Sequence, residues 1–136
     1  MELDLQWSDH YLVGVDEIDA QHIRLLQIMR NVFELREAES TSPALIKILY
    51  ELKKYAKFHF KSEEMLMELY EYPDYEEQRA EHQKIYSELK SKLKALKSEN
   101  DISDLLYFVV HWFVGHTRDH DRAMGRFISE SRLGLM

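Results

Sequence analysis

Four long stretches of the chain place apolar side chains three and four residues apart, the interval that gathers them on one face of an α-helix. The 136 residues include only 4 glycines and 2 prolines, and an all-β fold would need more of these turn-forming residues. The sequence therefore predicts a single all-α domain, an antiparallel up-and-down four-helix bundle with an N-terminal arm. We expect the arm over about residues 1–15 and the helices over about 16–38, 43–70, 74–97 and 102–129.

Local signals set the expected ends of these helices. Asp16 is suited to cap the first helix, and Pro43 suits the first position of the second, where a missing N–H costs nothing. Asp74 and Glu77 have the spacing of a capping box for the third helix. Residues 98–101 are expected to form the turn before the fourth.

Composition excludes several classes of function. A net charge of −7 disfavours nucleic acid as a partner, because phosphate binding needs a basic surface. No apolar run approaches the length of a membrane span, and no signal-peptide pattern opens the chain, so we expect a cytoplasmic protein without a membrane partner. With no cysteine, any metal ion must be held by histidine and carboxylate.

The apolar stripes also contain polar residues that need partners. His59 and Glu63 are four residues apart, so they lie on one face of their helix, within its apolar stripe. Each of the other stripes carries a histidine too, namely His22, His82 and His116. A buried charge is costly unless it is paired or bound to a metal. A core imidazole bonded to a carbonyl would explain one of these histidines, but four at once favour a shared metal site.

The order of these histidines along their helices fits one site. His22 and His82 come early in their helices, whereas His59 and His116 come late. In a bundle whose helices alternate in direction, all four can meet at one level. A cysteine-free site of this kind suits iron, zinc or manganese. Spacing alone pairs His116 with His120, four residues on.

Other metal and nucleotide sites are excluded by their spacing. No Glu-x-x-His pair of the ferritin-like kind lies on these helix faces. The sequence also lacks the His-Glu-x-x-His motif of zinc peptidases, a glycine-rich phosphate loop and a calcium loop.

Along nearly its whole length the chain resembles the bacterial single-domain hemerythrins. The matching positions are Trp7, Val13-Gly14-Val15, Ile18-Asp19-x-Gln21-His22, His59-Phe60-x-x-Glu63-Glu64, Tyr72-Pro73, His82, and Trp112-x-x-x-His116 with Asp121. The resemblance implies two iron ions joined by an oxo or hydroxo bridge. It assigns His22 and His59 to one iron, His82 and His116 to the other, and Glu63 and Asp121 to both.

Asp121 comes from the resemblance and not from periodicity. At about 100° per residue it lies about 140° round an α-helix from His116. An unbroken helix would therefore turn its carboxylate away from the histidine.

Three positions depart from the family pattern. Gln78 stands where the family has a histidine, and a neutral amide is a weaker ligand than imidazole, so the iron takes the Gln78 oxygen, takes water or is held less tightly. Phe113 and Thr117 stand over the oxygen pocket, where the family usually has leucine or isoleucine. We expect His120 to be an exposed histidine; the alternatives are an outer hydrogen-bond donor or a replacement for the missing imidazole. These changes predict that the metal site is still present but has an altered reactivity.

The function implied by the resemblance is reversible binding of dioxygen, for storage, delivery or sensing, with no catalytic residue. The alternative is a diiron enzyme that acts on peroxide or nitric oxide, which the departure at Gln78 favours. An iron-handling or sensory module is a further alternative. Oligomeric state does not follow from the sequence.

Overall fold

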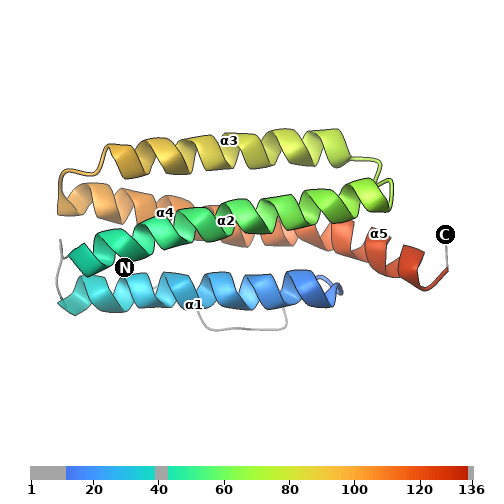
Figure 1. Cartoon of the computed structure of the whole chain (residues 1–136), viewed down its shortest axis with the longest axis horizontal. Coiled ribbons are helices and arrows are strands. Elements are labelled where there is room, and N and C mark those ends of the chain that lie inside the picture. The colour runs from blue at the N-terminus through green and yellow to red at the C-terminus, as the bar shows by residue number, and fades with distance from the viewer. Residues whose placement is uncertain (1–11, 39–42, 135–136) are drawn as a thin grey trace.

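The chain folds into four long helical rods that pack side by side (Figure 1). The computed structural model describes residues 12–38 and 43–134. The elements are α1 (Asp16–Ala38), α2 (Pro43–Leu69), α3 (Tyr75–Lys94), α4 (Glu99–His116), the π-helix η2 (Thr117–Asp121) and α5 (Arg122–Arg132). In Figure 1, α4 and α5 follow one another along the fourth rod. The predicted all-α four-helix bundle is confirmed; most of the predicted arm, with Trp7, lies outside the described residues.

The start of the fourth rod and the cap of α3 differ from the predictions. The fourth rod begins at Glu99 and not near residue 102, because Ser98 caps it. The Asp101 N–H donates to the Ser98 hydroxyl at 3.3 Å, and the Ser98 N–H donates to the Asp101 carboxylate at 3.1 Å. This reciprocal pair is a capping box. Asp74, by contrast, makes no side-chain hydrogen bond to the first turn of α3, so the capping box predicted there does not form.

The entry to α1 also differs from the prediction. The Val15 carbonyl accepts a hydrogen bond from the Asp19 N–H at 2.9 Å, which places Val15 at the cap and Asp16 inside the first turn. The Asp19 carboxylate accepts a hydrogen bond from the Val13 N–H at 2.8 Å, so it ties the preceding segment to the helix. The segment then passes close to α5. A Cβ at Gly125 would clash with the Val13 carbonyl oxygen, so this position requires glycine.

The buried apolar residues form two clusters. The larger cluster draws on all four rods and includes Leu25, Leu49, Leu89 and Leu105, each at most 1% exposed. The smaller cluster contains Val13, Val15, Ile18, Met67, Tyr72, Met124 and Ile128. The polar residues that the sequence singled out lie between the two clusters along each rod. Among the described residues, no helix is both long and apolar enough to cross a membrane.

Candidate metal centre

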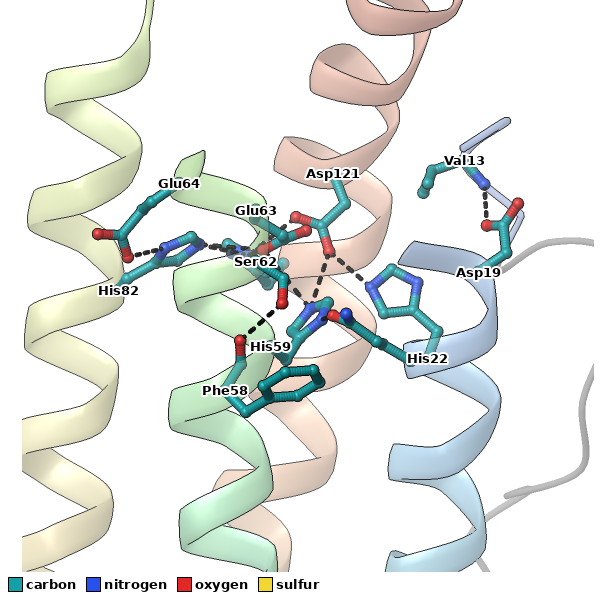
Figure 2. A network of polar contacts seen from close by, with 12 residues as sticks. Val13, Asp19, His22, Phe58, His59, Ser62, Glu63, Glu64, His82 and Asp121 are labelled. Carbon is teal, nitrogen blue, oxygen red and sulfur yellow. Dashed lines mark hydrogen bonds and ion pairs between the residues drawn. The ribbon is translucent and has the colours of Figure 1, made fainter. Parts of the chain in front are cut away.

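Six buried polar side chains from all four rods meet in one layer of the bundle (Figure 2). None is more than 5% exposed. They are His22 from α1, His59 and Glu63 from α2, His82 from α3, His116 from α4 and Asp121 from η2. The structure thus brings together every residue that the resemblance assigned to the metals.

Glu63 lies at the middle of this layer. Its Oε1 atom is 3.5 Å from His59 Nε2, 3.2 Å from His82 Nε2 and 3.3 Å from His116 Nε2. His82 Nε2 and His116 Nε2 are themselves 3.1 Å apart. The second oxygen of Glu63 has no hydrogen-bond partner among the described residues. One carboxylate therefore faces histidines from three different rods.

Asp121 reaches histidines on both sides of the layer. Its Oδ2 atom is 2.9 Å from His22 Nε2 and 3.9 Å from His59 Nε2. Figure 2 shows both contacts as dashed lines. Its Oδ1 atom is 2.9 Å from His116 Nε2. The two oxygens of Asp121 thus point toward different histidine groups.

The π-helix η2 explains how Asp121 comes to face His116. In this segment the Arg122 N–H donates to the Thr117 carbonyl, five residues earlier, where an α-helix would bond four residues back. A π turn takes in more residues than an α turn, so side chains five apart come onto one face. The 140° separation expected from α-helical geometry is removed by this local widening. Nothing in the apolar pattern of the sequence predicted it.

The outer nitrogens of two histidines are fixed by neighbouring side chains. His59 Nδ1 lies 2.8 Å from Gln21 Oε1, and His82 Nδ1 lies 2.9 Å from Glu64 Oε2. These contacts place the proton on Nδ1 and leave Nε2 as a ligand atom that faces the centre. Gln21 and Glu64 stood in the matching motifs, but their contacts join residues far apart in sequence and were not predicted.

The protonation of the layer follows from its burial and its charges. Burial lowers the pKa of His116, but the charge and hydrogen bond of Asp121, with those of Glu63, outweigh it and raise this pKa to about 10. Burial and the charge of His116 lower the pKa of His82 to about 4, although Glu64 acts in the opposite direction. Burial, followed by the charge of Asp121, raises the pKa of Glu63. In the metal-free protein, protons on His116 and Glu63 therefore offset the repulsion among these buried groups.

The donor set fits a pair of transition-metal ions. His22, His59, Glu63 and Asp121 form one group of potential ligand atoms within 4.8 Å of one another, and Glu63 forms a second with His82 and His116. Neighbouring ligands at about 2.1 Å from an ion, at right angles, lie about 3 Å apart. Most contacts in the layer, at 2.9–3.5 Å, have this spacing. The unpartnered Glu63 oxygen is a further open ligand position.

Comparison with known proteins identifies the family. Residues 13–128 match the Hemerythrin HHE cation binding domain. The chain belongs to the hemerythrin family. A bacteriohemerythrin of Clostridium acetobutylicum is 31% identical over 122 residues, which cover 85% of this chain and 95% of that protein. A myohemerythrin of Riftia pachyptila is 27% identical over 115 residues, which cover 85% and 86%.

A solved structure supports the same assignment. The crystal structure of a wild-type hemerythrin aligns with a TM-score of 0.76 and 26% identity, over 93% of this chain and 99% of that one. The buried histidine, glutamate and aspartate groups described above are those of a hemerythrin metal site.

Gln78 is the position where the resemblance led us to expect a histidine, and the structure shows where its side chain lies. Gln78 is 5% exposed, and its Nε2 lies 3.0 Å from His120 Nδ1. His120 is half-buried, with its ring centroid 5.4 Å from that of His116. The expectation that His120 is an exposed histidine is therefore wrong, because its ring contacts the buried Gln78 amide and is partly covered.

The other two departures are both buried. Phe113 and Thr117 are each 2% exposed. The Phe113 ring meets the His22 ring edge to face, with centroids 5.6 Å apart. His111 is exposed, and its ring centroid lies 3.9 Å from that of Tyr107.

Proposed function

We propose that this hemerythrin binds two iron ions, joined by an oxo or hydroxo bridge, and uses them to bind dioxygen reversibly. His22 and His59 hold one ion, His82 and His116 hold the other, and Glu63 and Asp121 are shared. The supporting observation is that each of these two carboxylates faces histidines of both pairs. Two ferrous ions supply the two electrons that reversible oxygen binding requires.

The chain's own residues prepare the site for this chemistry. Gln21 and Glu64 fix the imidazoles of His59 and His82 with Nε2 directed inward. Phe113 places an aromatic edge against His22 and helps to keep water from that side of the centre. Thr117 directly follows His116 in the chain and is buried, so we expect its hydroxyl to bond to a bound ligand or to water.

Anaerobic loading with ferrous iron tests the proposal. Metal analysis should give about two irons for each folded chain. Exposure to air should produce new absorption bands, and removal of oxygen should reverse them. The proposal fails if the folded protein retains only trace iron, or if air causes a change that oxygen removal does not reverse.

Two histidine variants make this test specific. His59→Ala should lose at least one iron and the reversible spectrum. His111→Ala removes an exposed histidine outside the centre, so it should keep both. Equal iron content in wild type and His59→Ala would contradict the assignment of the α2 face.

A second candidate function is favoured by the contact between Gln78 and His120. Because the Gln78 amide is engaged with His120, the iron held by His82 and His116 would lack the imidazole that the family has at this position. An open position there would favour turnover of peroxide or nitric oxide. Stopped-flow consumption of hydrogen peroxide by the iron-loaded protein distinguishes this enzyme from a carrier.

A further inference from the structure

Helix α2 carries a second apolar stripe, on a face that the bundle leaves exposed. Phe58, Met65 and Leu69 are 54%, 71% and 72% exposed. With Ser62 they recur at intervals of four, three and four residues, so they lie on one face of the helix. Single apolar residues are ordinary at a protein surface, but several on one face of one helix are typical of an interaction site.

The stripe is separate from the face of α2 that packs inside the bundle. At about 100° per residue, Phe60 and Met67 lie about 200° round the helix from Phe58 and Met65. Both are buried in the two apolar clusters. Ser62, the polar member of the stripe, donates its hydroxyl to the Phe58 carbonyl at 3.0 Å, so its donor is already satisfied (Figure 2). Helix α2 therefore has one apolar face for its own bundle and a second one at the surface.

The spacing of the stripe is that of a coiled-coil seam. It places Phe58 and Met65 at one of the two seam positions of a heptad, and Ser62 and Leu69 at the other. Consider two copies of α2 that run antiparallel about a twofold axis between residues 63 and 64. Phe58 then meets Leu69 of the second copy, and Ser62 meets its Met65, as the symmetry of a twofold interface requires. The stripe is therefore complementary to itself in this direction.

The charges beside the stripe favour the same direction. Lys61 and Glu68 are exposed and lie seven residues apart on one flank of the stripe. In the antiparallel pairing, Lys61 of each copy lies beside Glu68 of the other, which gives two contacts between opposite charges. In a parallel pairing, this flank of one helix meets the opposite flank of its partner, so the two charges would not meet. We infer that α2 pairs antiparallel with α2 of a second copy of this chain, through this stripe.

The expected dimer is weak, because the seam is short. Residues 58–69 span about 17 Å of helix at about 1.5 Å per residue, which is less than a standard stable interface needs. We expect a dissociation constant on the order of 0.1 mM. None of the stripe residues is assigned to the iron ions, so the dimer and the proposed oxygen chemistry can fail independently.

Sedimentation velocity of the iron-loaded full chain, from about 10 µM to about 1 mM, tests this inference. Wild type should change from monomer to dimer over this range. Met65→Asp places a charge in the seam and should weaken association at least about tenfold, so this variant stays largely monomeric. Because Met65 is 71% exposed, its helix content and iron content should not change. Tyr107→Asp alters a half-exposed aromatic ring on α4, and this matched control should dimerise like wild type.

Charge reversal tests the direction of the pairing. Lys61→Glu and Glu68→Lys each put like charges together and should weaken the dimer about three- to tenfold. The double variant restores opposite charges across the interface and should recover the wild-type dissociation constant within about twofold. A wild type that stays monomeric at every concentration overturns the inference and leaves the stripe to a different protein. It is also overturned if Met65→Asp dimerises like wild type, or if the double variant is no better than the single ones.

Discussion

Two neighbouring regions of the bundle interior, the larger apolar cluster and the polar layer, are stabilised in different ways. The larger apolar cluster consists of side chains such as Leu49 and Leu105, which are fully buried and need no partner. The layer beside it consists of four histidines and two carboxylates, equally buried, with donor atoms about 3 Å apart. The same four rods thus carry one region that is complete by itself and another that is completed by metal ions.

The difference teaches that stability and function are separable in this chain. Each fully buried leucine contributes roughly 1.5–3 kcal/mol by leaving water. Charged groups at the same depth carry a desolvation penalty that pairing only partly offsets. Selection for packing alone would not maintain such a layer, so its polar residues are best explained by what they bind.

Metal loading should give the largest effect, because it acts on the polar layer alone. At a free metal concentration 1,000 times the dissociation constant, each ion should add about 4 kcal/mol to the free energy of unfolding. Anaerobic urea denaturation of loaded and metal-free protein measures this difference. Equal stability of the two forms would show that the polar layer is complete without metal. The polar layer and the apolar cluster would then not differ in this respect.

Leu49→Ala should give the next largest effect, on the apolar cluster. The cavity should lower the free energy of unfolding by about 2–5 kcal/mol, by the same amount with and without metal. Leu69→Ala on the same helix is the control, because Leu69 is 72% exposed and its loss should change stability by less than about 0.5 kcal/mol. Loss of iron from Leu49→Ala would mean that the two regions are coupled.

Gln78→His should give a smaller effect, confined to the polar layer. Restoring an imidazole should tighten iron binding about 10- to 100-fold, slow the conversion of the oxygen-bound form to the oxidised form, and lower any peroxide turnover. Chelator competition and the decay of the oxygen-bound spectrum measure these changes.

The His120→Ala variant tests whether His120 already replaces the missing imidazole. If His120 already serves as the missing ligand, Gln78→His should change little and His120→Ala should release iron. If neither substitution alters iron content, oxidation or peroxide turnover, the Gln78 departure has no bearing on reactivity.

Glu17→Gln should give the smallest effect, because it lies in neither region. The Glu17 carboxylate accepts two hydrogen bonds from the Arg132 guanidinium, at 3.0 and 2.9 Å, and the pair links the start of α1 to the end of α5. Both side chains are at least 36% exposed, so the loss should be about 0.5 kcal/mol at pH 7, with iron content unchanged.

The pH dependence of this difference identifies its source. The hydrogen bond from Arg132 lowers the pKa of Glu17 from 4.5 to about 2. The stabilisation is therefore present above about pH 4.5 and is lost as the pH falls through about 2. Wild type and Glu17→Gln should unfold alike below that pH. A difference that persists there would assign the effect to something other than this ion pair.

The sequence by itself determined the four helices and the level at which their histidines meet. Both follow from local rules: apolar periodicity defines the buried face, and alternating helix direction brings His22, His59, His82 and His116 to one end. The Ser98 cap is equally local, because Asp101 lies three residues on. We interpreted residues 98–101 as a turn because they are mostly polar.

Only the tertiary structure decided how Asp121 reaches the centre and which side chains contact its histidines. Asp121 faces the histidines because η2 widens the fourth rod, which no α-helical periodicity predicts. Gln21 meets His59, Glu64 meets His82 and Gln78 meets His120 across gaps of 38, 18 and 42 residues. Such contacts depend on how whole helices are placed against one another, so the residues that tune the site become visible only in the folded chain.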